Sequence, residues 1–109
     1  MKSIHIKKFY PHWLEATEKG NPVQLFDVRT PQEYSAGHVP GATLIALNTL
    51  TARANEIPKD GDVFVICQVG GRSAQAIMFL SQRFGYDNLI NLEGGTGVWM
   101  QSGYPVERG

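Results

Sequence analysis

The sequence predicts an α/β domain built on a mainly parallel β-sheet. Short apolar runs alternate along the chain with stretches of helical periodicity, which is the pattern of parallel strands joined by helices. One run, residues 62–67, is almost continuously β-branched or aromatic, as expected of a strand that is covered on both faces. A chain of 109 residues has room for one such core, so we expect a single domain over residues 1–109.

Five short segments have the composition of strands. The most apolar, residues 62–67, ends at Cys67. The others are residues 23–28, residues 43–45 and residues 88–92, with residues 3–6 as a candidate edge strand. Because reactive groups of open parallel sheets usually lie beyond the carboxyl ends of the strands, Cys67 stands where chemistry is expected.

Helix signals fall between these strands, and the helices are expected to end at glycines. A first helix is predicted over residues 11–19, before Gly20. The longest is predicted over residues 73–84, before Gly85. Its apolar face would consist of Ala74, Ile77, Met78, Leu80 and Phe84.

A capping box predicts one more, shorter helix between the strand segments 23–28 and 43–45. The Thr30 hydroxyl can accept a hydrogen bond from the Glu33 backbone N–H while the Glu33 side chain reaches back. Pro31 suits the first helical position, and Gly37 would end the helix.

The composition excludes several classes of function. Ten basic and ten acidic residues cancel, so we expect no general affinity for nucleic acid or acidic membranes. No stretch approaches the roughly 20 apolar residues of a membrane span, and no apolar segment follows the first residues as in a signal peptide. We therefore expect a cytoplasmic protein that has neither nucleic acid nor a membrane as a partner.

Cys67 is the single cysteine, which excludes an intramolecular disulfide and leaves a free thiol in a reducing compartment. The histidines, His5, His12 and His38, are scattered, and none stands at a ligand spacing from Cys67. We expect neither a metal site nor a cofactor.

Residues 67–73 (CQVGGRS) connect the buried strand directly to the longest helix. Gly70 and Gly71 permit positive φ, so successive N–H groups can turn inward and form a site for an anion. The first turn of the helix adds unpaired N–H donors, and Arg72 adds a permanent positive charge. These groups should lower the pKa of the Cys67 thiol, because they stabilise the thiolate.

Each of these residues alone has a simpler explanation. A single cysteine after an apolar run is usually a small core residue, and a single arginine is often a surface ion-pair partner. Their combination at a strand-to-helix turn favours a reactive Cys67. We therefore predict Cys67 as the catalytic residue. The predicted substrate-binding residues are Gln68, Val69, Gly70, Gly71, Arg72 and Ser73.

Asp27 and Arg29 end another strand on the same side of the sheet. Asp27 could pair with Arg29 or Arg72, or it could orient amides of the loop. We expect Asp27 and Arg29 to give structural support to the neighbouring loop. His38 lies in a turn-rich crossover and is expected to hydrogen-bond the backbone rather than to act as a base.

The glycine-rich residues 93–97 open a last helix, in which Trp99 is expected to belong to the core. This turn could lie beside Cys67 and form one wall of its pocket. It could equally serve only as the entry to the helix.

Three motifs follow one another along the chain. They are residues 27–42 (DVRTPQEYSAGHVPGA), residues 67–73, and residues 92–95 (LEGG) followed by Trp99 and residues 103–106 (GYPV). In this order they resemble the rhodanese-like sulfurtransferases in their single-domain form. With the first helix, the resemblance covers nearly the whole chain.

The resemblance implies a rhodanese-like three-layer α/β/α domain with a five-stranded, mainly parallel sheet flanked by helices. It also implies a sulfurtransferase without a cofactor, in which Cys67 becomes a persulfide. The donor would be thiosulfate, a polysulfide or a persulfide, and the acceptor cyanide or a thiol, with a protein sulfur carrier as a further partner. The backbone of residues 68–73 would stabilise the bound sulfur, and Arg72 would help to hold an anionic donor.

Two other functions are alternatives to sulfur transfer. Related phosphatases place five residues between cysteine and arginine, whereas four separate Cys67 from Arg72, which disfavours phosphate. A non-catalytic binding or regulatory module is the other, and Cys67 argues against it because inactive relatives commonly lack the cysteine. Many thiosulfate-using members carry positive charge where this chain has Gln68 and Val69, so a persulfide or polysulfide is as well supported a donor as thiosulfate.

Overall fold

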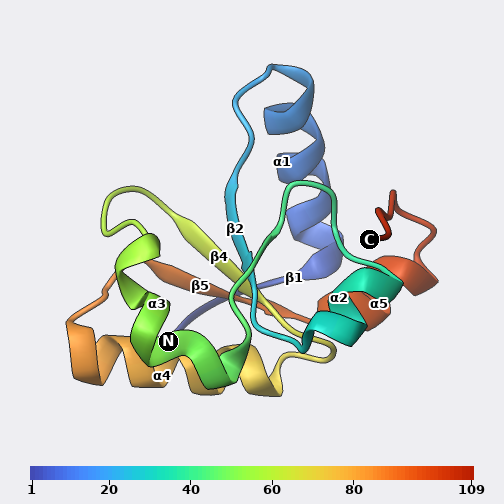
Figure 1. Cartoon of the computed structure of the whole chain (residues 1–109). Helices are drawn as coiled ribbons and strands as arrows, with labels where there is room; N and C mark the ends of the chain where they lie inside the picture. Colours follow the sequence, from blue (N-terminus) through green and yellow to red (C-terminus); the bar gives the residue numbers. More distant parts are fainter.

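In the computed structural model, which describes residues 1–109, five strands form one sheet (Figure 1). The strands are β1 (Lys2–His5), β2 (Gln24–Asp27), β3 (Thr43–Leu44), β4 (Val63–Ile66) and β5 (Leu89–Glu93). Their order is β1-β5-β4-β2-β3, and every neighbouring pair is parallel. The predicted five-stranded, mainly parallel sheet is therefore confirmed, with β1 as the edge strand.

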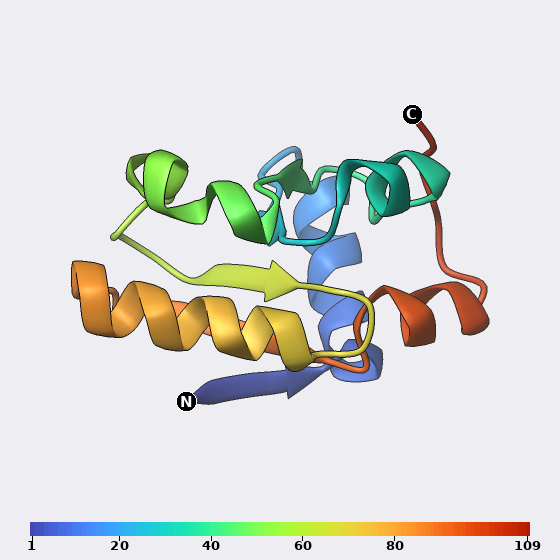
Figure 2. The same ribbon diagram turned by 60° about the horizontal axis from the view of Figure 1, so that its bottom comes forward.

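Helices cover both faces of this sheet. They are α1 (Ile6–Glu18), α2 (Pro31–Ala36), α3 (Leu50–Arg53), α4 (Gly71–Phe84) and α5 (Gly95–Gln101), with the 3₁₀ helices η1 (Leu47–Thr49) and η2 (Ala54–Glu56). In Figure 2, α3 and α4 lie in front of the sheet and α1 lies behind it. None of the helices is both long enough and apolar enough to cross a membrane.

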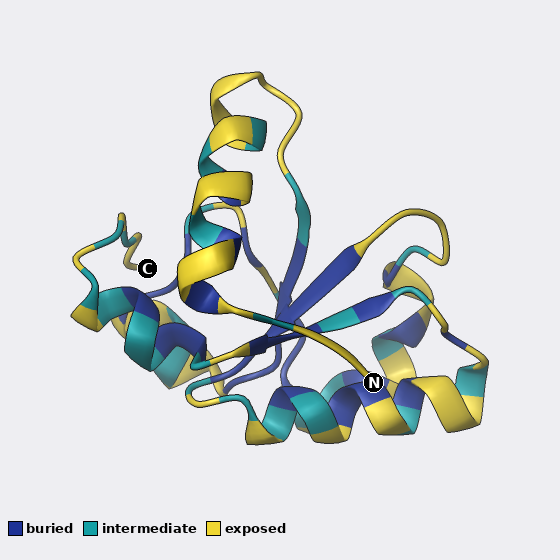
Figure 3. Ribbon diagram, turned by 180° about the vertical axis from the view of Figure 1, so that it is seen from behind, coloured by how far each residue is buried: buried dark blue, intermediate teal, exposed yellow.

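The central strand β4 separates two hydrophobic clusters. Val63 and Val65 belong to the cluster under α3 and α4, whereas Phe64 and Ile66 belong to the cluster that contains residues of α1 and α5. All four side chains are buried, and Figure 3 shows β4 as dark blue along its length. Burial on both faces explains why this strand is apolar at every position rather than at alternate ones.

The first helix begins earlier than predicted. It starts at Ile6 instead of residue 11, because the His5 side chain caps it by accepting a hydrogen bond from the Lys7 N–H at 3.1 Å. Pro11 therefore lies inside the helix, where its missing N–H costs stability. Ile6, Phe9 and Trp13 are buried on the inner face of the helix, and this burial holds it together across the proline. 

The predicted capping box is present at the start of α2. The Thr30 hydroxyl accepts from the Glu33 N–H at 3.2 Å, and the Glu33 carboxylate accepts from the Thr30 N–H at 3.1 Å. Pro31 takes the first helical position, and Gly37 is the C-cap. 

Helix α4 has a somewhat different inner face from the one predicted. It ends at Gly85, as expected, but Met78 is 53% exposed. The buried residues are Ser73, Ala76, Ile77 and Leu80. Their spacing of three and four residues defines one stripe, and Met78 lies one position, about 100° of rotation, beyond it.

The helical segment over residues 47–56 was not predicted from the sequence. The N-cap residues of η1, α3 and η2 make no side-chain capping hydrogen bond, so the usual start signal is missing. Leu50 and Ala54 are buried in the cluster shared with α4. Tertiary packing, rather than local sequence, defines this segment.

Candidate active site

The loop after β4 carries the candidate nucleophile. Cys67 is the first residue after the strand, and α4 begins at Gly71. Gly70, the N-cap of α4, has φ 114°, in the left-handed region that favours glycine. This conformation turns the Gly70 N–H toward the Cys67 Sγ, at an N···S distance of 3.0 Å. 

The loop lowers the pKa of the Cys67 thiol below its ordinary value of 9.0. Burial is the largest single influence and raises the pKa. The Ser73 hydroxyl, whose Oγ lies 3.3 Å from Sγ, and the backbone N–H groups of Ser73, Gly70 and Val69 act in the opposite direction and outweigh burial. The predicted direction of the shift is confirmed, and its cause is hydrogen bonding to the thiolate.

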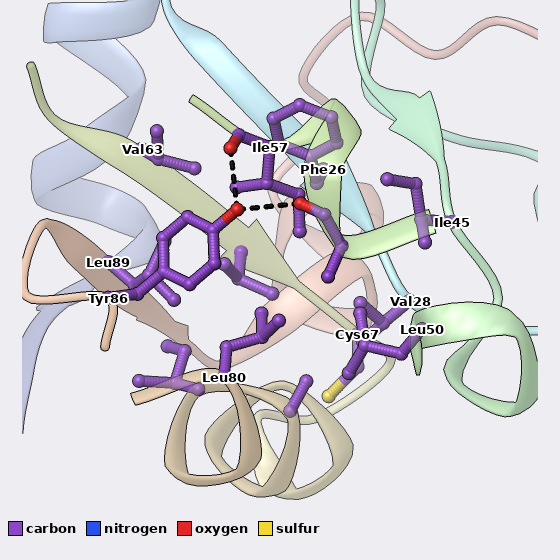
Figure 4. Packing of buried hydrophobic residues seen from close by; sticks show 14 residues of the cluster. Phe26, Val28, Ile45, Leu50, Ile57, Val63, Cys67, Leu80, Tyr86 and Leu89 are labelled. Atoms are coloured by element: carbon purple, nitrogen blue, oxygen red, sulfur yellow. Dashed lines mark hydrogen bonds between the residues drawn. The ribbon is translucent and has the colours of Figure 1, made fainter. Parts of the chain in front are cut away.

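Cys67 is at the same time part of the hydrophobic core. The residue is 0% exposed and belongs to the cluster under α4. Figure 4 shows its side chain near those of Val28 and Leu50, with the sulfur on the side that faces α4. From the sequence, a core cysteine and a reactive cysteine were alternatives. The fold shows that Cys67 is a core residue whose sulfur also accepts a hydrogen bond from the loop, and its reactivity stays a prediction.

A buried polar pair, Ser73 and Asn91, lies next to the sulfur. The Ser73 hydroxyl has one hydrogen and three acceptors within reach: the Asn91 Oδ1, the Gly70 carbonyl at 3.1 Å and the Cys67 Sγ. The Asn91 amide also donates to the Gly70 carbonyl at 3.2 Å. Asn91 was missed in the sequence, although a buried amide inside the apolar strand β5 is a signal, because such a group needs partners.

Asp27 and Arg29 form a buried ion pair beside the loop, with 0% and 2% of their surfaces exposed. Arg29 Nε and Nη2 donate to the Asp27 carboxylate at 2.8–3.1 Å. The remaining donors reach the Gly37 carbonyl at 2.8 Å and the Gln68 Oε1 at 3.2 Å. Of the two partners considered for Asp27, Arg29 is the one found. The pair connects the end of β2 to the residue that follows Cys67.

Arg72 lies against helix α2. Its Nη1 and Nη2 donate to Oε1 and Oε2 of Glu33 at 2.7 and 2.9 Å. These hydrogen bonds are the main reason why the pKa of Glu33 is lowered to about 2, with smaller contributions from Thr30 and against the effect of burial. The expectation that Arg72 holds an anionic donor stays a prediction, and the structure shows that its guanidinium already has a carboxylate partner.

The glycine-rich turn before α5 packs directly on the loop. The Thr96 N–H and hydroxyl both donate to the Cys67 carbonyl, at 2.9 and 3.1 Å, and the Gly97 N–H donates to the Gln68 carbonyl at 3.0 Å. A Cβ on Gly95 would lie 2.5 Å from the Cys67 carbonyl oxygen, so this close approach requires glycine. The turn therefore lies directly beside Cys67 and packs on the backbone of the loop.

Two residues outside the loop have the structural places that the sequence predicted. His38 Nδ1 lies 2.8 Å from the Tyr34 carbonyl oxygen, and its ring stacks on the Tyr34 ring at a centroid distance of 3.7 Å. Trp99 is 0% exposed and donates its indole N–H to the Pro105 carbonyl at 2.6 Å.

A surface hollow of about 500 Å³ adjoins the loop at Arg72. It is lined by Val28, Arg29, Thr30, Pro31, Gln32, Ala46, Leu47, Asn48 and Arg72. Its volume is in the range of small-molecule sites, although Cys67 is not part of its lining. No three His, Cys, Asp or Glu side chains are grouped so that they could hold a metal ion.

A parallel α/β domain with a stabilised thiolate at the head of a short anion-binding loop is typical of enzymes that transfer a group through cysteine. Residues 10–102 match the family model of the rhodanese-like domain. The chain therefore belongs to the rhodanese-like domain family, and the resemblance predicted from its motifs is confirmed.

Relatives of this chain support the same assignment. A protein from Allochromatium vinosum named sulfurtransferase is 42% identical over 84 residues, which cover 77% of this chain and 78% of that protein. An uncharacterized protein of Bacillus subtilis is 42% identical over 76 residues, which cover 70% of this chain and 60% of that protein. 

Solved structures resemble the whole chain. A rhodanese-like domain protein from Staphylococcus aureus has a TM-score of 0.82 and 32% identity, over 100% of this chain and 99% of that chain. A rhodanese-related protein from Thermoplasma volcanium has a TM-score of 0.77 and 32% identity, over 98% of both chains. The fold class predicted from the sequence is therefore confirmed.

Proposed function

We propose that this protein is a sulfurtransferase that carries sulfane sulfur as a persulfide on Cys67. The observation that carries the proposal is the 3.0 Å contact between the Gly70 N–H and the Cys67 Sγ, in a loop that lowers the pKa of the thiol. Membership of the rhodanese-like family and 42% identity to a protein named sulfurtransferase support the same chemistry.

The transfer proceeds in two displacements at sulfur. The Cys67 thiolate attacks the outer sulfur of the donor, a new S–S bond forms, and the donor's S–S bond breaks with its electron pair leaving on sulfite or on a thiolate. The acceptor, cyanide or a thiolate, then attacks the outer sulfur of the persulfide, and the Cys67 thiolate leaves. The Gly70 N–H and the Ser73 hydroxyl stabilise the sulfur anion at both stages, so one difficult transfer becomes two easier ones.

The substrates in this proposal are small sulfur compounds and, as a further acceptor, a protein sulfur carrier. Thiosulfate, polysulfides and organic persulfides are the candidate donors. The hollow beside Arg72 has room for the body of a small donor or acceptor. A reducing compartment, which we take to be the cytoplasm because the chain has a single cysteine, would keep Cys67 free to react.

Intact-mass measurement tests the proposal directly. After incubation with thiosulfate, polysulfide or an organic persulfide, the protein should gain the mass of one sulfur atom, and cyanide should remove it as thiocyanate. Cys67→Ser should gain nothing while keeping the circular dichroism spectrum of the wild type. Absence of any gain with all three donors, while a thiol reagent shows Cys67 to be free, would falsify the proposal.

The phosphatase alternative has less support. Only four residues separate Cys67 from Arg72. The Arg72 guanidinium, which would have to bind phosphate, is already paired with the Glu33 carboxylate. An aryl phosphate in the same series of assays should not be hydrolysed. Hydrolysis that depends on Cys67 would contradict sulfur transfer as the main activity.

A further inference from the structure

Both guanidinium groups at the candidate active site are already neutralised by carboxylates. Arg72 is the only charged residue within residues 67–73, and it donates two hydrogen bonds to Glu33. Arg29, which contacts the loop through Gln68, donates to the Asp27 carboxylate. The loop around the Cys67 sulfur therefore offers backbone N–H and hydroxyl donors, but no positively charged side chain without a carboxylate partner.

The Glu33 carboxylate cannot easily turn away from Arg72. Its Oε1 also accepts hydrogen bonds from the Thr30 N–H and the Thr30 hydroxyl, both at 3.1 Å, because Glu33 is the third helical residue (N3) of α2 and closes the capping box. With a pKa of about 2, the carboxylate is ionised at any pH at which a sulfurtransferase would be assayed. One sequence motif thus starts a helix and also presents a fixed negative charge to the loop arginine.

We propose that Glu33 is a specificity-determining residue: by neutralising Arg72, it disfavours thiosulfate as a donor relative to organic persulfides. The inference rests on the proposed sulfurtransferase function and names the donor class for it. Glu33 takes no part in bond making, because it acts on the reaction only through Arg72.

The charge balance of the two donor reactions explains the preference. With thiosulfate, the Cys67 thiolate must meet a dianion, and the transfer yields a persulfide anion and a sulfite dianion. With an organic persulfide in its protonated form, R–S–SH, the thiolate meets a neutral molecule, the transfer yields Cys67–S–SH and R–S⁻, and the proton is then exchanged with water. Three negative charges are brought together in the first reaction and one in the second, so only the first needs an uncompensated cation.

A comparison of the two donors in matched variants tests the inference. The second-order rate constant of Cys67 persulfide formation is measured by quenched intact mass, once with thiosulfate and once with 2-hydroxyethyl persulfide, whose body carries no charge. Glu33→Gln keeps the shape and capping capacity of the side chain but removes its charge. In this variant the ratio of the thiosulfate constant to the persulfide constant should rise about tenfold, because a dianion then meets an unpaired guanidinium.

Two further variants control the comparison. Glu56→Gln removes the same charge from a similar ion pair, in which Arg53 donates to both Glu56 oxygens at 2.8 Å. Glu56 lies in η2 and not on the loop, so this variant should leave the ratio unchanged. The double variant Glu33→Gln with Arg72→Gln should return the ratio to the wild-type value or below, since the freed guanidinium is gone.

The outcomes separate the inference from the proposed function. If the wild type acquires sulfur from neither of these donors nor from polysulfide, the proposed function is wrong. Sulfur taken from polysulfide alone would overturn the specificity role of Glu33 but not the function. If the wild type acquires sulfur and the ratio is the same in Glu33→Gln, or still raised in the double variant, the specificity role of Glu33 is wrong while the function stands. Should Glu33→Gln not fold, Glu33→Asp provides the test, because its shorter carboxylate withdraws from Arg72 and should raise the ratio by a smaller factor.

Discussion

Replacing Ser73 with alanine should make Cys67 a weaker acid and a slower nucleophile near neutral pH. Burial, the largest influence on the Cys67 pKa, raises it and is not changed by this substitution. The Ser73 hydroxyl is the strongest of the groups that lower the pKa, and the substitution removes it. The Gly70 N–H stays in place, whereas the contacts of the Ser73 hydroxyl with Sγ, the Gly70 carbonyl and the Asn91 Oδ1 are lost together.

The size of the effect follows from the geometry. A hydrogen bond to a charged group contributes about 1.5–3 kcal/mol, and sulfur at 3.3 Å is a weak acceptor, so we take the lower value, about 1.5 kcal/mol. This corresponds to about tenfold less thiolate at a fixed pH below the pKa. The rate of persulfide formation should fall by a smaller factor there, about threefold, because a thiolate of higher pKa is intrinsically more nucleophilic, and it should reach or exceed the wild-type rate at high pH. The unpaired Asn91 Oδ1 should lower the free energy of unfolding by about 1 kcal/mol.

The assay is the pH dependence of Cys67 alkylation by iodoacetamide, together with the ultraviolet absorbance of the thiolate. Ser81→Ala is the matched control, because Ser81 is an exposed serine on the same helix. The alkylation profile of Ser73→Ala should move to higher pH, and that of Ser81→Ala should coincide with the wild type. A uniform loss of rate at every pH would refute the reasoning, since it would mean that Ser73 only supports the structure.

Two other predictions concern stability and loop geometry. Because the folded pKa of Glu33, about 2, lies below its ordinary 4.5, its ion pair stabilises the fold fully above about pH 4.5 and is lost as the pH falls through about 2. The difference in the free energy of unfolding between wild type and Glu33→Gln should therefore shrink over that window, and a constant difference in urea titrations would contradict the pairing with Arg72. Gly95→Ala should slow persulfide formation, because its Cβ would lie 2.5 Å from the Cys67 carbonyl oxygen at a positive φ of 58°. Gly20→Ala is the control: φ is 72° but no atom lies near the added Cβ, so this substitution costs only the backbone strain of a positive φ, about 1–3 kcal/mol. An equal effect of both substitutions on persulfide formation would argue against the close approach at Gly95.

Much of the fold could be predicted because its signals are local. The apolar run of β4, the capping box of α2 and Gly85 after α4 each act within a few residues of the element that they define. The helix over residues 47–56 and the early start of α1 could not be predicted in this way. The first has no capping side chain. The second has a local cap in His5, but the helix continues through the internal Pro11 because its inner face is buried.

The sequence alone determined the loop that carries the candidate nucleophile. Cys67, Gly70 and Ser73 lie within seven consecutive residues, so one strand-to-helix turn brings them together and sets the direction of the Cys67 pKa. The motifs over residues 27–42 and 92–95 determined the family in the same way, since they are contiguous in the chain.

Only the tertiary structure decided what surrounds that turn. The contact of Glu33 with Arg72 and that of Arg29 with Gln68 each span 39 positions, and Asn91 reaches Ser73 across 18. Such pairs form when the order and register of the whole sheet are set, because they depend on which strand ends lie side by side. The charge balance at Cys67, on which the proposed choice of sulfur donor rests, is therefore a property of the assembled sheet and not of the loop.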